Sequence, residues 1–308
     1  MGSKTHYSVL LKESIDAVIS DVEGIYIDCT FGRGGHSEAL LGKLSEKARV
    51  IAFDKDPEAV AVGRALSERD PRFTIVHGSF VELEKVKDVH GLDYVDGILM
   101  DLGVSSPQLD DAERGFSFLH DGPLDMRMNS SSGQTAATWI NSAAESEIAL
   151  VLKNYGEERF AKRMAKAIVA TREKTPFLRT QQLADVISRA NPKWERGKHP
   201  ATRAFQAIRI KVNRELEELQ ESLPKALEIL KSGGRMVVIS FHSLEDRIVK
   251  RFFKDEAKGD DLPARLPLTE MQINRRLKLI SRAQKASAQE IAENIRSRSA
   301  VMRVAEKI

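Results

Sequence analysis

A glycine-rich segment near the N-terminus is the first group of residues suited to chemistry. It runs from Asp28 to His36 with the sequence DCTFGRGGH and follows an apolar run that predicts a β-strand. Glycines let the backbone approach a ligand, and a helix beginning near Ser37 would direct free N–H groups at it. Such a turn can also serve only to pack a strand against a helix. Asp54, at the end of the next apolar run, has the spacing of an acidic residue that binds a ribose hydroxyl pair, so the two features together predict a nucleoside-containing cofactor.

The residue that ends the first strand distinguishes two such cofactors. A dinucleotide fingerprint has the spacing G-x-G-x-x-G after a strand with an apolar end. Here the glycines are spaced differently and the strand ends in Asp28. A carboxylate at that position would repel a pyrophosphate, but it suits a cofactor with a cationic sulfonium and an amino group. The pattern therefore favours S-adenosylmethionine over a nicotinamide dinucleotide.

Two more polar residues follow expected strands, at the edge where α/β folds gather ligands. Asp101 ends the apolar run 97–100, and His242 lies just past the run 235–240. An ionised aspartate accepts hydrogen bonds but is a weak base for a neutral amine. We therefore expect Asp101 to orient an accepting nitrogen and to stabilise the positive charge that develops there. His242 would contact the substrate or a proton, or would simply cap the helix beginning at Leu244.

The composition limits the class of protein. The chain has 308 residues, of which 42% are hydrophobic and 30% charged, as in ordinary globular proteins. Its single cysteine, Cys29, leaves no intrachain disulfide and fits a reducing cytoplasm, the expected location. The seven histidines show no close His/Cys pairing, so no metal site is expected. Neither a signal peptide nor an apolar run of membrane-spanning length is predicted.

Positive charge is concentrated in one part of the chain. The net charge is only +3, but residues 153–214 hold sixteen lysines and arginines against five acidic residues. Such a segment predicts a polyanionic partner, although solvated helix faces are often basic as well. The residues predicted to hold nucleic-acid phosphates are Lys198, Arg203, Arg209 and Lys211. Trp139 is a candidate for stacking on a base, although a core position is the more common one for a tryptophan.

The elements that would position these residues alternate along the chain. Apolar β-rich runs are found at 26–28, 50–53, 73–76 and 97–100, with helical stretches between them at 37–44 and 57–67. This alternation predicts a parallel sheet covered by helices on both faces. After residue 214 come a helix (215–230), a strand (235–240), a helix (244–253), a proline-containing loop (260–267) and two β-like runs (277–280 and 300–304). The last two runs fit a hairpin added to the sheet.

The stretch between the fourth and fifth strands is helical in pattern and holds most of the basic residues. We expect it to be an insertion into the parallel sheet. The predicted domains are therefore a cofactor-binding domain formed by residues 1–106 and 215–308, and a helical substrate-recognition domain formed by residues 107–214.

Six longer motifs are spread along the chain. They are DLGVSSPQLD from Asp101, RGFSF from Arg114, GPLDMRM from Gly122, HPATRAFQ from His199, SFHSLED from Ser240 and RSRSA from Arg296. Together they resemble the MraW/RsmH family of bacterial small-subunit rRNA cytosine-N4 methyltransferases. The resemblance extends from about His6 to the last expected strand, and Cys29 replaces the glycine that is usual in the family. It implies a class I, Rossmann-like methyltransferase fold with a mostly parallel seven-stranded sheet.

The resemblance also implies roles for individual residues. The cofactor-binding set is Gly34, Gly35, His36, Asp54, Phe80, Asp101 and Gln108. The ring of Phe80 would lie against adenine, with a core position as the alternative. Where amino-methyltransferases acting on DNA have an Asp/Asn-Pro-Pro-aromatic motif, this chain has Asp101-Leu102-Gly103-Val104. The proton acceptor therefore stays open between Asp101 and backbone carbonyls of the turn.

The implied activity is methylation, by S-adenosylmethionine, of the exocyclic N4 of a decoding-centre cytidine in 16S rRNA, cytidine 1402 in the family. The expected partner is 16S rRNA within the small ribosomal subunit, and a homodimer is a possible assembly. A DNA amino-methyltransferase, which shares the fold and chemistry, is the main alternative. A nicotinamide-dependent dehydrogenase and a non-catalytic RNA-binding module are others; the presence of Gly34, Asp54 and Asp101 argues against the last.

Overall fold

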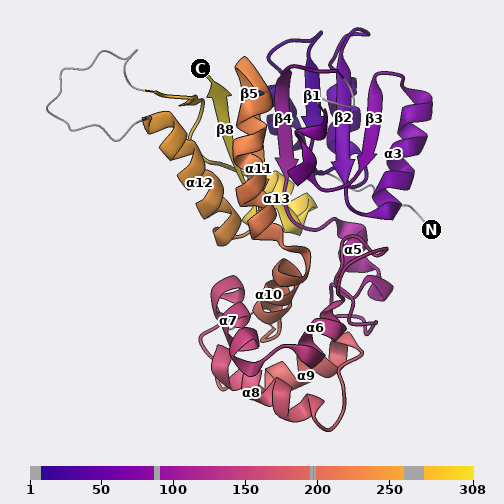
Figure 1. The fold of residues 1–308 in the computed structure, drawn as a ribbon, viewed down its shortest axis with the longest axis vertical. Coiled ribbons are helices and arrows are strands. Elements are labelled where there is room, and N and C mark those ends of the chain that lie inside the picture. The colour runs from indigo at the N-terminus through magenta and orange to yellow at the C-terminus, as the bar shows by residue number, and fades with distance from the viewer. Residues whose placement is uncertain (1–7, 87–90, 195–196, 198, 260–273) are drawn as a thin grey trace, which may run out of the picture. The chain divides into compact units, whose positions relative to one another are not determined.

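The computed structural model describes residues 8–86, 91–194, 197, 199–259 and 274–308. The chain forms two compact units, one of residues 1–103 and 216–308, the other of residues 104–215 (Figure 1). This division falls within three residues of each boundary expected from the sequence. Each unit has a hydrophobic core of its own, so we describe the two in turn as the sheet unit and the helical unit.

The sheet unit is built on a mixed sheet of eight strands in the described residues. The strands are β1 (Ile25–Asp28), β2 (Arg49–Asp54), β3 (Phe73–His77), β4 (Val95–Asp101), β5 (Leu230–Ser240), β6 (Leu277–Leu279), β7 (Gln284–Lys285) and β8 (Val301–Lys307). Their order is β3-β2-β1-β4-β5-β8-β6, with β7 also paired to β8. Strands β1 to β5 are parallel, whereas β8 is antiparallel to β5. The predicted class I methyltransferase sheet is confirmed, with the two-residue β7 as an addition to the seven expected strands.

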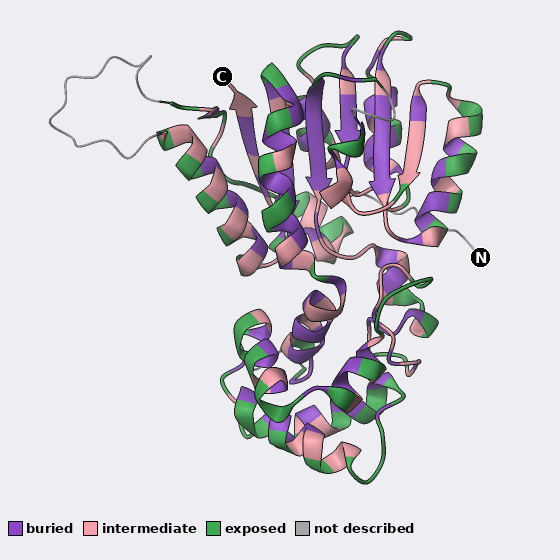
Figure 2. Ribbon diagram, in the orientation of Figure 1, coloured by how far each residue is buried: buried purple, intermediate pink, exposed green. Residues whose placement is uncertain are grey.

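Helices cover both faces of this sheet. They are α1 (Leu11–Val18), α2 (Gly35–Leu41), α3 (Pro57–Arg69), α11 (Glu215–Ile229), α12 (Ser243–Lys258) and α13 (Ala288–Glu293). Alternate residues of β1 point to opposite faces, so Tyr26 packs in the core with α1, α2 and α3, while Ile27 packs in the core with α11 and α12. The central strands are consequently buried along most of their length (Figure 2). The predicted loop 260–267 lies outside the described residues.

The topology marks one edge of the sheet as the place for a ligand. The chain order reverses at β1, which lies between β2 and β4. In open α/β sheets, ligands bind outside the carboxyl ends of the strands at such a switch point. Here the three strands concerned all end in an aspartate: Asp54 in β2, Asp28 in β1 and Asp101 in β4.

The helical unit confirms the helical pattern of the insertion. Its helices are α5 (Ser106–Asp110), η2 (Ala112–Arg114), α6 (Ala136–Ser142), α7 (Glu145–Gly156), α8 (Ala161–Arg172), α9 (Thr180–Ala190) and α10 (Thr202–Asn213). Met164, Leu183 and Ile208 are fully buried in its core. Among the described residues of either unit, no helix has both the length and the apolar character needed to cross a membrane.

Candidate active site

Asp28 is the most deeply buried of the three strand-end aspartates, with 1% of its surface exposed. Ser37 Oγ–H donates to its Oδ2 at 2.7 Å, and the Thr30 N–H donates to its Oδ1 at 3.1 Å. Burial raises the pKa of Asp28, and the two hydrogen bonds lower it. The carboxyl group thus ties β1 to helix α2. This placement corrects the expectation that Asp28 would present its charge to the cofactor, because its bonds support the glycine turn from within.

The glycine turn has the backbone geometry that its sequence predicts. Gly34 precedes helix α2 with φ of +86°, in the left-handed region that favours glycine. A Cβ atom at Gly34 would also lie 2.8 Å from the ring of Phe31. Gly35 opens the helix, and a Cβ atom there would lie 2.1 Å from Ser8 Oγ. Gly34 is therefore restricted to glycine, whereas a larger residue at Gly35 would require the Ser8 side chain to move.

Asp54 is held in a fixed orientation by backbone donors. The Gly32 N–H donates to Oδ2 at 2.7 Å and the Asp56 N–H donates to Oδ1 at 2.8 Å. Burial raises the pKa of Asp54 to about 6, against the lowering effect of these bonds. A carboxylate oxygen can accept more than one hydrogen bond, so Asp54 keeps acceptor capacity for a pair of hydroxyl groups.

Phe80 is partly packed in the core and partly exposed, so both positions predicted for it, against adenine and in the core, apply in part. It begins the short helix η1 (Phe80–Glu82) after β3. Its side chain is partly exposed, and it packs against the core that lies between the sheet and α11. One part of the ring therefore anchors the loop, and the exposed part can contact a planar ligand.

Asp101 differs from the other two aspartates because part of its carboxyl group lacks a partner. Its backbone N–H donates to Thr30 Oγ1 at 2.7 Å, which fixes the end of β4. Its side chain is 22% exposed, and Oδ2 lies 3.6 Å from Nδ1 of His36. Oδ1 is buried and accepts no hydrogen bond from the part of the chain that the structure describes. Burial raises the pKa of Asp101 to about 6, while the nearby His36 lowers it.

His242 has the helix-capping role that was one of its two predicted functions. It is the N-cap of α12, and its Nδ1 accepts the backbone N–H of Glu245 at 3.4 Å. In return, Glu245 Oε2 accepts the N–H groups of Phe241 at 2.8 Å and His242 at 3.3 Å. This reciprocal capping box satisfies two of the free donors at the start of the helix. A catalytic role of His242 would therefore have to use Nε2, which lies 3.1 Å from Glu245 Oε1.

The comparisons with known proteins identify the family. The model of the MraW methylase family matches residues 3–308. The chain belongs to this family. Three relatives carry the name "Ribosomal RNA small subunit methyltransferase H". The one from Marinomonas sp. (strain MWYL1) is 55% identical, covering 98% of this chain and 97% of its own. That from Idiomarina loihiensis is 57% identical, covering 99% and 98%, and that from Chromohalobacter salexigens is 54% identical, covering 98% and 92%. The resemblance drawn from the six motifs is confirmed.

The helical unit of this MraW methylase contains the remaining predicted site residues. Gln108 is 6% exposed in α5, and its Oε1 accepts the Ser105 N–H at 2.9 Å in another capping box. Its contact with the cofactor stays a prediction. Lys198 lies outside the described residues. Lys211 is 39% exposed on its side chain, with Nζ 3.3 Å from Glu147 Oε1.

Two predicted nucleic-acid contacts are corrected by the structure. Trp139 is 4% exposed in the core of the helical unit, where its Nε1–H donates to Glu147 at 3.0 Å, so neither ring face can stack on a base. Arg209 forms two hydrogen bonds of 2.8 Å with Glu215, and its side chain is only 15% exposed. A guanidinium in a bidentate, mostly buried ion pair is a structural group rather than a phosphate ligand.

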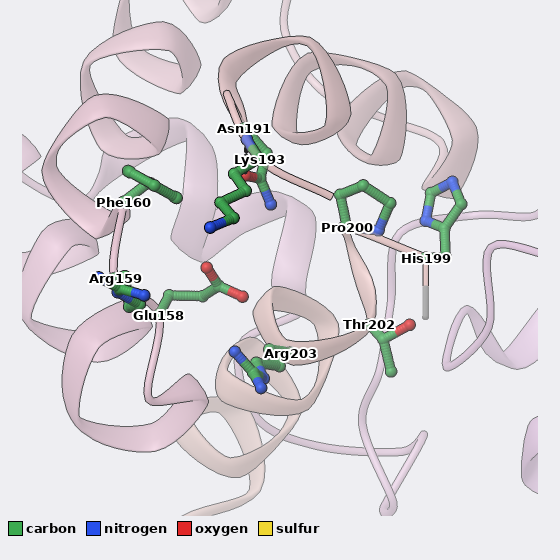
Figure 3. Close-up of a pocket in the computed structure, with 9 residues that line it drawn as sticks. All are labelled: Glu158, Arg159, Phe160, Asn191, Lys193, His199, Pro200, Thr202 and Arg203. Atoms are coloured by element: carbon green, nitrogen blue, oxygen red, sulfur yellow. Dashed lines mark hydrogen bonds between the residues drawn. The ribbon is translucent and has the colours of Figure 1, made fainter. Parts of the chain in front are cut away.

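A cavity of about 90 Å³ in the helical unit brings other basic side chains together (Figure 3). It lies between α8, α9 and α10 and is lined by Arg159, Lys193 and Arg203, among other residues. Trp194, the residue after Lys193, is 63% exposed, and its ring centroid lies 6.1 Å from that of His199 in the cavity wall. Trp194 is not among the residues predicted from the sequence, although an aromatic residue within the basic run KWERGK is a recognisable signal for nucleic-acid binding.

Proposed function

We propose that this MraW methylase transfers a methyl group to the exocyclic N4 of a cytidine in 16S rRNA, at the position equivalent to cytidine 1402. S-Adenosylmethionine is the methyl donor. Relatives at 54–57% identity are named as methyltransferases of small-subunit ribosomal RNA, which supports rRNA as the substrate. The assembled small subunit, in the cytoplasm, is the form of substrate that we propose.

The residues at the carboxyl edge of the sheet fit this cofactor. Asp54 offers a fixed carboxylate to the ribose hydroxyls, and Gly34 lets the backbone approach. The partly exposed ring of Phe80 suits adenine. The carboxyl group of Asp101 adds negative charge beside a cationic sulfonium, which a dinucleotide pyrophosphate would not tolerate.

The unpartnered Oδ1 of Asp101 is the observation that carries the assignment of an amine acceptor. A buried oxygen that accepts no hydrogen bond is costly, by about 1–3 kcal/mol, unless a ligand supplies the donor. The exocyclic amine of cytosine has two N–H groups, and one of them would satisfy this oxygen. An N–H or O–H donor on the substrate is needed for this interaction.

Methyl transfer from an activated donor requires the protein mainly to position the two reacting groups. When bound, S-adenosylmethionine supplies a methyl group whose carbon is attacked by the N4 lone pair, so that the C–N bond forms while the electrons of the C–S bond pass to sulfur. Asp101 accepts an N–H hydrogen bond and thereby orients that lone pair. Its carboxylate stabilises the positive charge that develops on N4 and is placed to accept the proton that the nitrogen then releases.

We assign RNA recognition to the helical unit. Arg159, Lys193 and Arg203 around its cavity would contact phosphates, which supply affinity more than sequence choice. Trp194 offers the exposed ring on which an unpaired base can stack, in place of the buried Trp139. The homodimer stays a prediction, which light scattering of the purified protein checks.

The deciding experiment supplies labelled cofactor to undermethylated small subunits and analyses the nucleosides. The expected product is N4-methylcytidine, and Asp101→Ala should remove most of it. Naked 16S rRNA and duplex DNA, given in parallel, distinguish the alternatives. Label in duplex DNA but not in small subunits would establish the DNA amino-methyltransferase instead.

A further inference from the structure

The imidazole of His36 is enclosed between a backbone carbonyl and the carboxyl group of Asp101. The residue is 4% exposed. Its Nε2 lies 3.2 Å from the carbonyl oxygen of Val9, and its Nδ1 lies 3.6 Å from Asp101 Oδ2. Both ring nitrogens thus face groups of the protein itself, while the predicted contact of His36 with the cofactor stays a prediction.

The contact with Val9 determines which ring nitrogen carries hydrogen. A carbonyl oxygen can only accept, so the Nε2–H of His36 must be the donor. In a neutral ring, Nδ1 then carries a lone pair on the side of Asp101. A lone pair and a carboxylate repel each other, and a proton held by the pair removes the repulsion. The separation of 3.6 Å between His36 Nδ1 and Asp101 Oδ2 is longer than a hydrogen bond but within the range of an ion pair. The interaction therefore depends more on charge than on donor geometry.

Burial and the acidic groups near Asp101 raise its pKa, whereas His36 lowers it. Burial is the main cause that raises the pKa of Asp101; Asp28, which ends the neighbouring strand, and Glu245, in the first turn of α12, raise it too. His36 lowers it, and the net result of all these effects is a pKa raised to about 6. His36 therefore counteracts the surroundings that would otherwise protonate Asp101 near neutral pH.

We propose that His36 is a positioning residue that acts through Asp101. Its imidazolium, anchored by Val9, keeps the Asp101 carboxyl group ionised and engages Oδ2, which leaves Oδ1 for the amine of the substrate. The inference rests on the proposed function, because it takes Asp101 as the group that receives the amine. It predicts that the pH range of methyl transfer is set by the pair rather than by Asp101 alone.

His36→Gln tests the inference by removing the charge while keeping an amide donor for the Val9 carbonyl. Single-turnover methyl transfer to small subunits, with cofactor saturating, is measured against pH. The acidic limb of the profile should move upward by about one to three pH units, because an opposite charge at this distance has an effect of that size. The rate lost near neutral pH should return in alkaline buffer. A deficit equal at all pH values would mean that His36 is only structural.

His77→Gln is the matched control, since His77 is exposed and its Nε2 also lies 3.2 Å from a backbone carbonyl, that of Lys55. Its pH profile should equal that of the wild type. A second readout needs no activity: NMR spectra of labelled histidines, with the His36 signal assigned by its absence in His36→Gln. In Asp101→Asn the ring signals of His36 should move, and those of His77 should stay unchanged.

The outcomes separate the inference from the proposed function. If the wild type methylates no cytidine in small subunits, the proposed function fails, and the NMR comparison still tests the pair. If the wild type is active, yet the pH profile of His36→Gln and the His36 signals in Asp101→Asn are both unshifted, the pairing is refuted and the function stands.

Discussion

Asp54→Asn is expected to change the pH dependence of folding stability while it weakens cofactor binding. Burial raises the pKa of Asp54 from an ordinary 3.8 to about 6. As the pH falls through 6, the folded protein takes up a proton that the unfolded chain does not bind until the pH approaches 3.8. The contribution of Asp54 to stability is therefore unfavourable at neutral pH and improves as the pH falls from about 7 to about 4. Asparagine does not titrate, so the variant lacks this dependence.

The size of the effect follows from the same two values. A difference of about 2 pH units between folded and unfolded chains corresponds to about 3 kcal/mol at neutral pH. The variant also disturbs the hydrogen bonds from Gly32 and Asp56. That disturbance is the same at every pH, since asparagine stays neutral. A comparison across pH therefore cancels it and isolates the burial of the charge.

The assay is urea denaturation of wild type and variant at several values between about pH 7.5 and pH 4.5. The free energy of unfolding of Asp54→Asn, relative to wild type, should fall by about 2 kcal/mol over this range, since the full effect is reached only below the unfolded pKa. Asp70→Asn is the control. Its carboxyl group is paired with Arg72, which lowers its pKa, so its difference from wild type should stay flat until the pH falls below the ordinary value. A flat difference for Asp54→Asn would refute the reasoning. Calorimetry should show weaker cofactor binding by about 10–150-fold, the equivalent of 1.5–3 kcal/mol for a bond to a charged acceptor.

Three further predictions concern catalysis and RNA. Asp101→Asn keeps an acceptor oxygen and should lose much of the single-turnover rate, and Asp101→Ala should lose more. Both variants should lose less in RNA affinity than in rate. An unchanged rate for the alanine variant would mean that backbone carbonyls are the acceptor. Trp194→Ala should weaken RNA binding by about 1–3 kcal/mol, whereas Trp194→Phe should retain most of it, as filter binding would show. Replacing Arg159, Lys193 and Arg203 together by glutamine should flatten the plot of log affinity against log salt by about 2 and spare cofactor binding; an unaltered slope would place the phosphates elsewhere.

Much of the sheet unit could be predicted because its signals are local. Apolar runs of strand length located β1 to β5, and the aspartates that end β2 and β4 located the edge at which Asp54 and Asp101 lie. The class I methyltransferase fold followed from the family resemblance. The length of α12 was underestimated, because residues 254–258 are mostly charged, are mostly exposed and carry no apolar pattern.

The side-chain partners were harder to predict because they are distant in the sequence. His36 meets a carbonyl of Val9, 27 residues earlier, and no periodic pattern connects these positions. Arg209 pairs with Glu215 across the left-handed turn at Arg214, a spacing that no helical rule favours. The burial of Trp139 and the exposure of Trp194 were hard to predict for a related reason. Burial depends on the packing of the whole helical unit, which the sequence around one residue does not define.

The pairing of β4 with β5 has a consequence for how the chain acquires its structure during synthesis. Asp101 and Ile239 are partners across these strands, so the central ladder joins residues separated by roughly 140 positions. The helical unit between them is synthesised in full before β5, and its helices meet over shorter chain separations: α7 contacts α8, α8 contacts α9, and α10 contacts α7. Local helical contacts form quickly, whereas distant parallel pairing is slow. The edge of β4 therefore stays unpaired for part of the synthesis, and an unpaired strand edge is prone to aggregation.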